Sequence, residues 1–276
     1  MFSRIVVGVD GAQGGTDALA LARRLASLTS EIVAVSIGVP DDHPTRGANL
    51  DYDRTVREDA SARLAELPRR EPEITGQTLI AATVAAGLHA AVTDVDADLI
   101  VIGSCRRGPI GQILAGDDAR ATLQGARCPV AIAPRDYALR DTPITTIGLG
   151  WNGGPDGENA LEIAQGLADD LHGHVHAVTV TGAEATATYT GRTPAPGDAD
   201  APPSAPEGVE VTTVRGVPVD ELERFAAEVD VMVVGSHQRG PLGRFTLGSA
   251  SERLTQRCVR PLIVVPRTVQ TATSPA

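Results

Sequence analysis

Lysine is absent from this chain of 276 residues, and all 24 of its Lys or Arg positions are arginine. A phosphate-loop NTPase of the Walker type needs a lysine on the β/γ-phosphates, and a Schiff-base enzyme needs one to attack its carbonyl substrate. Both of these classes are therefore excluded. Aromatic residues make up only 3% of the chain, so the interior must be built from Ala, Val, Leu and Ile.

Basic charge is scarce in both halves of the chain. Residues 1–140 carry 15 arginines against 18 acidic residues, and residues 141–276 carry 9 against 17. Neither half offers a basic face for a nucleic-acid backbone or an anionic membrane. No apolar stretch approaches membrane-spanning length, and residues 1–4 lead into a strand rather than a signal sequence. We expect a cytoplasmic protein with no nucleic-acid or membrane partner.

Cysteine is also rare, and its three positions lack CxxC or paired metal-ligand spacing, which suits a reducing compartment. Cys128 and Cys258 flank the start of an apolar run and are interpreted as small buried residues. Cys105 is followed by Arg106 and Arg107, which would favour a reactive thiolate. An inert thiol is the favoured interpretation of Cys105.

Histidines alternate at His172, His174 and His176, so we expect them to share one face of a strand. An HxH pair can hold zinc, but no third or fourth ligand follows at a suitable spacing. We predict no metal site.

One glycine-rich block occurs twice, as GSCRRGPIG at residues 103–111 and as GSHQRGPLG at residues 235–243. An apolar run that opens with aspartate, DLIVI or DVMVV, precedes each block. A second run, PVAIAPR or PLIVVPR, follows each block after the same interval. The constant offset of 132 residues indicates a duplicated domain. A strand, a Gly-rich loop and a helix start in this order are typical of a phosphate-holding turn.

Strand-like and helix-like segments alternate through the first half, which predicts a parallel sheet covered on both faces and hence an α/β fold. The expected strands are residues 5–9, 32–37, 74–80, 99–102 and 130–133. The expected helices are one capped by Thr16 or Asp17, one at 51–67 stopped by Pro68, one at 83–93, and one ending at Leu123.

The second half repeats this plan and then departs from it. A strand at 144–149, a helix at 158–171 and a strand at 174–180 are followed by residues 181–208, which are rich in Ala, Pro, Gly and Thr. We interpret this segment as a mobile loop that replaces a helix. The predicted organisation is a domain at 1–140, a linker at 135–142, a second domain at 141–267, and a tail at 268–276.

With the repeat, the strand order and the glycine loop assembled, the chain resembles a tandem universal stress protein. The resemblance implies two tandem five-stranded parallel-sheet domains of the Rossmann-like, adenine-nucleotide-binding type. The family motif for ATP is Gly-x2-Gly-x9-Gly followed by Ser or Thr, downstream of an aspartate that ends the first strand.

The second half retains most of this motif. Gly235, Gly248 and Ser249 stand at the motif spacing, whereas the second glycine is replaced by Gln238 and the strand-end aspartate by Asn152. The carbonyl of Asn152 can still accept from an adenine amino group. Glycines would let the backbone approach phosphate oxygens, and helix-start amides and hydroxyls would donate to them.

The first half departs further from the motif. Asp10, Gly103 and Gly116 match, but the second glycine is Arg106 and the Ser/Thr position is Asp117. A carboxylate at this point repels phosphate, so we expect an arginine pair with Asp117 and a self-occupied site.

Nucleotide binding is therefore predicted mainly in the second half. Trp151 has two interpretations, contact with adenine or packing against the sheet. The candidate nucleotide-binding residues of the second half are Gly150, Trp151, Asn152, Val180, Val234, Gly235, Ser236, His237, Gly248, Ser249, Ala250 and Ser251. The weaker candidates of the first half are Val9, Asp10, Gly103 and Gly116.

The ligand implied by the resemblance is ATP or another adenine nucleotide, with or without Mg²⁺, in a protein of stress or dormancy adaptation. No Gly-x-Ser-x-Gly elbow or acid–base pair is found, so we predict binding without efficient turnover and no catalytic residues. A hydrolase or transferase of the related fold would instead release ADP steadily. The competing hypothesis is an interaction module that binds no nucleotide and recruits an unknown protein partner.

The two halves are expected to pack as an internal pseudo-dimer. The resemblance implies that the fifth strands, at 129–133 and 261–265, associate as the family's subunits do, which would protect two exposed sheet edges. A further homodimer is left open.

Overall fold

The computed structural model describes residues 2–40, 50–105, 112–182, 202–236 and 249–266. The first half contains β1 (Arg4–Gly8), α1 (Gln13–Leu25), β2 (Glu31–Gly38), α2 (Leu50–Ala62), α3 (Leu67–Arg70), β3 (Thr75–Ile80), α4 (Val84–Val95), β4 (Leu99–Gly103), α5 (Asp117–Leu123) and β5 (Val130–Ala133). After a 3-10 turn, η1 (Tyr137–Leu139), come β6 (Thr146–Gly150), α6 (Pro155–Leu171), β7 (His174–Thr181), β8 (Glu210–Arg215), α8 (Pro218–Ala226), β9 (Val231–Gly235), α9 (Ser249–Arg257) and β10 (Leu262–Val265).

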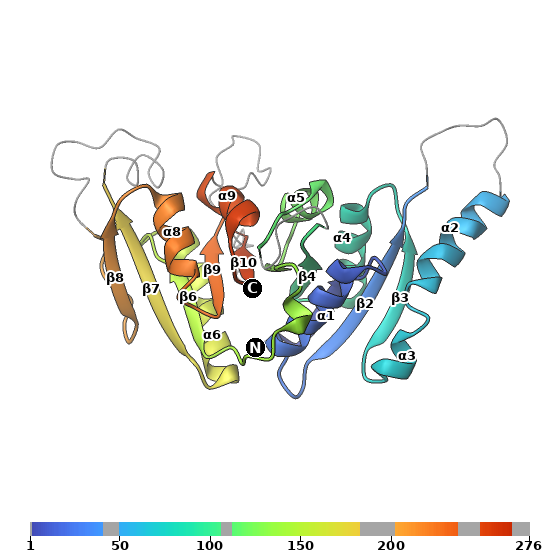
Figure 1. Ribbon diagram of the computed structural model, residues 1–276, viewed down its shortest axis with the longest axis horizontal. Helices are drawn as coiled ribbons and strands as arrows, with labels where there is room; N and C mark the ends of the chain where they lie inside the picture. Colours follow the sequence, from blue (N-terminus) through green and yellow to red (C-terminus); the bar gives the residue numbers. More distant parts are fainter. Residues whose placement is uncertain (1, 41–49, 106–111, 183–201, 237–248, 267–276) are drawn as a thin grey trace, which may run out of the picture.

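All ten strands form one sheet in the order β3-β2-β1-β4-β5-β10-β9-β6-β7-β8. Neighbouring strands within each half are parallel, as predicted. β5 and β10 pair antiparallel, with Ala131 opposite Ile263, so the predicted association of the fifth strands is observed. Figure 1 shows the two halves side by side, with β3 and β8 toward the outer edges. The predicted α/β architecture is confirmed, and the two parallel sheets are continuous.

Apolar side chains alternate between the two faces of the sheet, and helices bury both faces. On one face, strand residues such as Val6 and Ile100 pack with residues of α4, α5, α8 and α9. On the other face, residues such as Val7 and Val101 pack with α1, α6 and Tyr137. Among the helices of the described ranges, none has the length and apolar character needed to cross a bilayer.

The first helix does not begin where the sequence suggested. α1 begins at Gln13, and neither Thr16 nor Asp17 caps it. Instead, the Oδ1 atom of Asp10 accepts from the backbone amides of Ala12 and Gly15, at 2.9 and 3.1 Å. An Asx turn upstream therefore leads the chain into the helix. In the second half, Oδ1 of Asn152 likewise accepts from the amide of Gly154 at 3.0 Å, and α6 begins at residue 155 rather than 158.

Two other predicted segments also differ. The helix expected at 51–67 ends at residue 62, and Pro68 lies in the first turn of α3. Proline suits this position because first-turn amides need no intrahelical acceptor. The linker 135–142 contains the η1 turn, and the buried carboxylate of Asp17 accepts from the amides of Asp136 and Ala138, both at 2.8 Å.

The segment predicted as a mobile loop is partly packed. Residues 183–201 of this prediction lie outside the described residues, as does the tail 268–276. Residues 202–206 contact the second half, because Trp151 Nε1–H donates to the Ser204 carbonyl at 2.9 Å. Gly153 has a positive φ of 68°, and a Cβ there would collide with Pro203. Residues 202–206 form neither helix nor strand, as expected for a loop, and these contacts hold them against the second half.

An aspartate before the fourth strand of each half ties that strand to the start of the first strand. The carboxylate of Asp230 accepts from the amides of Thr145 and Thr146, both at 2.9 Å. Asp98 accepts in the same way from the amides at residues 3 and 4. Burial acts to raise the pKa of Asp230, but hydrogen bonds from the two threonines and the charge of Arg260 outweigh it, so the net pKa lies below its usual range.

This lowered pKa predicts an acid dependence of stability. The unfolded chain protonates an aspartate near pH 3.9, and the folded chain does so at lower pH. The contribution of Asp230 is therefore fully present above about pH 4 and is lost as the pH falls through the folded-state pKa. We expect Asp230→Asn to lose less of its free energy of unfolding between pH 7 and pH 3 than the wild type. Urea unfolding at each pH, followed by circular dichroism, measures this loss.

Glu58→Gln serves as the control, because Glu58 is exposed on α2 and forms an ion pair with the equally exposed Arg54, at 3.6 Å. It should lose as much stability on acidification as the wild type. An equal loss in Asp230→Asn would contradict the role assigned to this carboxylate.

Candidate functional site

A cavity of about 230 Å³ lies in the first half, at the carboxyl ends of β1 and β4. These two strands are neighbours in the sheet, while β2 and β5 flank them on opposite sides. The crossovers from β1 and β4 therefore run in opposite directions and leave a crevice between them, which is the usual ligand site of open parallel sheets. The predicted crevice between the first and fourth strands is thus present in this half.

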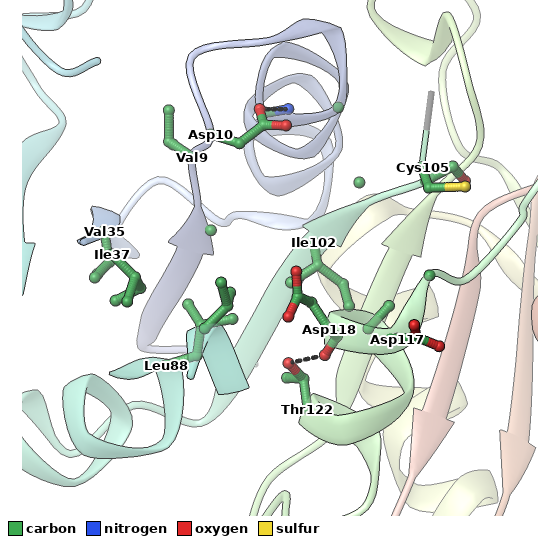
Figure 2. A pocket seen from close by; sticks show the side chains of 18 of the residues that line it. Val9, Asp10, Val35, Ile37, Leu88, Ile102, Cys105, Asp117, Asp118 and Thr122 are labelled. Atoms are coloured by element: carbon green, nitrogen blue, oxygen red, sulfur yellow. Dashed lines mark hydrogen bonds between the residues drawn. The ribbon is translucent and has the colours of Figure 1, made fainter. Parts of the chain in front are cut away.

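The inner wall of the cavity is apolar. It is formed by Val35 and Ile37 of β2, Leu88 of α4 and Ile102 of β4, all of them buried. Gly8 lies between them, and an added Cβ would reach Ile102 at 3.4 Å and Leu88 at 3.5 Å. Figure 2 shows these aliphatic side chains gathered on one side of the cavity. Such a wall suits a flat, apolar ring.

Acidic side chains line the outer part of the same cavity. They are Asp10, after β1, and Asp117 and Asp118, in the first turn of α5. All three are exposed to solvent. Figure 2 shows the side chains of Asp117 and Asp118 at the start of α5. The cavity therefore presents hydrogen-bond acceptors and negative charge at the point where the family motif places a hydroxyl.

One cation lies among the described residues that line this cavity. Arg63 follows α2, and its guanidinium donates to the Ile37 carbonyl at 3.1 Å. The self-occupied site expected from the sequence involved Arg106 or Arg107, which lie outside the described residues. That hypothesis stays a prediction.

Gly103 allows the end of β4 to meet the first turn of α1. A Cβ at Gly103 would run into the main chain of Gly14. In the second half, a Cβ at Gly235 would likewise run into the main chain of Asp156. The first motif glycine of each half is therefore required by helix packing, whereas the sequence suggested a close approach to phosphate. Gly116 differs, because the one described atom that a Cβ there would meet is Cys105 Cβ, at 3.5 Å.

Several predicted residues of the second half come together at the equivalent position. Gly150 ends β6, and an added Cβ would reach Val234 of β9 at 3.2 Å. Val180 and Val234 are buried in the same apolar cluster, and Ala250 packs against it. Ser236 and Ser251 are also buried, and the Ser236 hydroxyl has no hydrogen-bond partner among the described residues.

Other predicted residues of the second half are not placed at this crevice. The side chain of Trp151 is 7% exposed and belongs to the apolar cluster on the α6 side of the sheet, opposite to Val180 and Val234. The packing interpretation of Trp151 is therefore the one that the structure favours. His237 and Gly248 lie outside the described residues, and Ser249 is placed as the first residue of α9.

Much of the cavity lining was missed in the sequence, including Val35, Ile37, Leu88 and Ile102 of the apolar wall. Asp118 and Arg63 line the first cavity, and Asp156 lies buried beside Gly235 in the second half. Asp118 directly follows Asp117, and Asp156 aligns with Gly14 when the two halves are aligned by their first strands. Both positions could therefore have been found from the sequence. Leu88 could not be found in this way, because the offset in residue number between α4 and α8 differs from that between the strands around them.

The cysteine and histidine predictions have mixed outcomes. Cys128 and Cys258 are buried as predicted, and burial raises the pKa of their thiols to about 12 and about 11. Cys105 is half-buried and lines the cavity. His172 caps α6 with a φ of 53°, so it does not share a strand face with His174.

The third histidine, His176, has ordinary packing partners. Its ring lies edge-on to Phe225, and its Nε2 lies 2.8 Å from the Thr212 hydroxyl. In the part of the chain that the structure describes, no three His, Cys, Asp or Glu side chains are grouped for a metal ion.

The contrast between Gly103 and Gly116 predicts different tolerance to a methyl group. Gly103→Ala should lower the free energy of unfolding by about 3 kcal/mol, because α1 must move away from β4. Gly116→Ala should cost less than about 1 kcal/mol, the usual effect of alanine at a helix N-cap. Urea unfolding of both variants measures the difference, and equal stabilities would contradict the assigned packing role of Gly103.

Comparison with known proteins identifies the family. Residues 1–134 and 143–266 each match the model of the Universal stress protein family. A universal stress protein of Mycobacterium tuberculosis is 30% identical over 157 residues, which span 54% of this chain and 54% of the relative. A second one from that organism is 27% identical over 184 residues, which span 61% and 62%. The chain thus spans about half the length of the first of these relatives.

Solved structures agree with this assignment at the level of the fold. A universal stress protein of Archaeoglobus fulgidus is 17% identical, with a TM-score of 0.66 over 96% of this chain and 98% of the other. One from Pseudomonas aeruginosa is 16% identical, with a TM-score of 0.63 over 97% and 94%. Because the family model matches most of its length, the chain belongs to the universal stress protein family.

Proposed function

We propose that this universal stress protein binds an adenine nucleotide, ATP, in its second half and does not turn it over efficiently. The observation that carries the proposal is the difference between two helix starts at the same place in the fold. α5 begins with Asp117 and Asp118, whereas α9 begins with Ser249, Ala250 and Ser251. Phosphate is favoured beside the neutral helix start and disfavoured beside the acidic one.

The second-half crevice has the groups that such a ligand needs. Within the described part of the chain, the buried Ser236 hydroxyl has no hydrogen-bond partner. The first amides of α9, a helix of nine residues, point toward its N-terminal end. The carbonyl of Asn152 is already engaged with Gly154 at 3.0 Å, so its amide group would be the one that donates to the adenine or ribose. The sequence suggested that Asn152 accepts a hydrogen bond from the ligand, whereas here it would donate one.

Asp156 determines the form in which the nucleotide should bind. Its side chain is 8% exposed, and its main chain and Cβ lie against Gly235 at the end of β9. A carboxylate near phosphate oxygens is unfavourable unless a cation reduces the charge of the phosphates. We therefore propose Mg-ATP rather than free ATP as the ligand.

The role of such binding in stress or dormancy adaptation is proposed from the family alone. A cytoplasmic location is proposed from the three free cysteines, two of them buried, which suit a reducing compartment.

One observation favours the competing function, an interaction module without nucleotide. Gly103 and Gly235 are required by the packing of α1 and α6, so their presence is explained without a ligand. In that case the internal pairing of the two halves would be the scaffold, and an unknown protein would be the partner. The two functions differ in whether Mg-ATP stabilises the chain.

Calorimetric titration of Mg-ATP into nucleotide-free protein tests the proposal. We expect one site per chain, and no steady release of ADP. The variant Ser249→Asp gives α9 an acidic start like that of α5 and should weaken ATP binding about tenfold or more, because a carboxylate then faces the phosphates. Thermal unfolding without ligand should remain close to that of the wild type, since helix starts tolerate acidic residues.

The matched control is Asp118→Glu, which retains the acidic first turn of α5. It should leave the ATP affinity unchanged. No heat at millimolar Mg-ATP in the wild type would exclude nucleotide binding in the second half and would favour the interaction module. Continuous ADP release would instead indicate a hydrolase or transferase.

A further inference from the structure

We propose that a groove between the two halves binds an extended basic peptide of a partner protein. The groove, termed the α6 groove, lies between α6 and the residues that precede β4 and β5, and its volume is about 670 Å³. Its lining includes Phe2, Asp98 and Cys128 of the first half and Glu162, Ile163 and Asp169 of α6. None of these residues is a candidate nucleotide-binding residue, so this binding does not depend on the proposed function.

The pseudo-twofold relation between the halves gives the α6 groove a counterpart beside α1. β5 and β10 pair with Ala131 opposite Ile263, two positions that are equivalent in the sequence repeat. The residues that precede β4 and β5 therefore correspond to those that precede β9 and β10. Likewise α1, which begins at Gln13, corresponds to α6, which begins at Pro155. The counterpart groove lies between α1 and the starts of β9 and β10.

The chain's own linker, residues 135–142, is seated in this counterpart groove. The guanidinium of Arg140 donates to the Val259 carbonyl at 3.3 Å. The ring of Tyr137 is buried, and the guanidinium of Arg24 lies 4.9 Å from its centroid. The charge of Asp230 also acts on the Tyr137 hydroxyl. A groove of this construction therefore accepts an extended segment that carries an aromatic ring and a guanidinium.

The positions that the linker meets have equivalents in the lining of the α6 groove. Arg24 corresponds to Gly166, Asp230 to Asp98 and Val259 to Arg127. Gly166, Asp98 and Arg127 all line the α6 groove. The two grooves are thus the same place in the two halves, and the α6 groove is the one that remains open to a partner.

Apolar surface in the α6 groove suits an aromatic side chain. Leu21 of α1 is 0% exposed and belongs to the same apolar cluster as Tyr137. Its equivalent on α6, Ile163, is only half-buried and lines the groove. Phe2 and Cys128 are buried and supply further apolar lining. An aromatic ring in the groove would remove the exposed part of Ile163 from water, which favours binding.

α6 also has an acceptor for the backbone of a bound peptide. The carboxylate of Asp17 in α1 accepts from the linker amides of Asp136 and Ala138, both at 2.8 Å. Its equivalent on α6 is Asn159, which is half-buried. The side-chain carbonyl of an asparagine can accept hydrogen bonds from peptide amides as a carboxylate does.

Carboxylates on α6 favour a basic occupant. Glu162 and Asp169 line the groove and are exposed, whereas the equivalent residues of α1 are Ala20 and Ser27. Ionised carboxylates accept hydrogen bonds and pair well with guanidinium groups. An arginine of a bound peptide would therefore find acceptors on α6 that α1 does not offer.

Arginines of the counterpart groove are also replaced. Burial and the neighbouring charge of Arg260 lower the pKa of Arg140 in the linker, so that guanidinium is held beside a like charge. Cys128 stands at the position of Arg260 in the α6 groove. Arg127 adds a positive charge at the position of Val259, but Gly166 removes that of Arg24. An arginine would thus meet less repulsion beside α6 than Arg140 meets beside α1.

The test is calorimetric titration of the full chain with a synthetic peptide. Its sequence, PRNYALRNT, is that of residues 134–142 with Asp136 and Asp141 replaced by asparagine and with both ends capped. We expect saturable binding at one site. The same peptide with both arginines replaced by glutamine should bind about fivefold more weakly, since it lacks the charges that pair with exposed carboxylates. Equal affinities, or no binding of the basic peptide at millimolar concentration, would overturn the proposal.

Variants of α6 locate the peptide. Gly166→Arg introduces the arginine that α1 has at Arg24, and should weaken binding about tenfold or more because a long cationic side chain then occupies the groove. Gly166→Ala is the matched control and should bind like the wild type. Both changes suit a helix interior, so neither should lower the temperature of unfolding.

A second pair of variants tests the charges. Glu162→Gln/Asp169→Asn should weaken binding of the basic peptide about fivefold, which is the effect expected for two exposed ion pairs. It should leave binding of the glutamine peptide unchanged. Glu158→Gln is the control, because Glu158 is exposed on the same helix and does not line the groove.

Other occupants of the groove give different results. Peptide binding that survives in Gly166→Arg would place the peptide elsewhere and overturn the assignment. Spermidine that competes at the same concentration as the peptide would identify a site for small cations instead of a peptide. A dimer of the chain that forms in the wild type and dissociates in Gly166→Arg would identify a second copy as the occupant. Each of these results differs from the one expected for a basic peptide, whether or not the chain binds ATP.

Discussion

The antiparallel pairing of β5 with β10 is the contact on which the rest of the molecule depends. It joins two parallel half-sheets through main-chain hydrogen bonds and leaves neither of these two strands as an exposed edge. It also brings the β4–α5 segment of the first half onto the second half. The amide of Ile113 donates to the Cys258 carbonyl at 2.7 Å, and that of Ala115 to the Thr255 carbonyl at 2.8 Å. The two crevices are thereby held on the same side of one sheet.

Within this frame, the backbone defines the crevices and the helix starts define their chemistry. Glycines at the ends of β4 and β9 are needed for the close packing of α1 and α6, so the two halves share this backbone contact. What differs is the first turn of the next helix, acidic in α5 and neutral in α9. Substitutions at these positions change the charge that a ligand meets without disturbing the sheet.

Much of the fold could be predicted from the sequence, because buried parallel strands are continuous apolar runs between helices. The site was harder to predict. Trp151 follows a strand end, and sequence alone does not say which face of the sheet such a residue joins. Helix starts were misplaced because Asp10 and Asn152 form turns from upstream, a contact that a search for caps beside the helix overlooks. A cavity such as that at Leu88 depends on helix packing, which the strand pattern does not reveal.

The physical link between the two crevices follows from the elements that bear them. α5 and α9 are joined by the Arg120–Glu252 ion pair as well as by the main-chain contacts beside it. The ion pair is about two-fifths exposed on both sides, so it contributes little by itself. The main-chain contacts are stronger constraints, because a shift of α9 would have to move residues 113–115, which lead directly into α5.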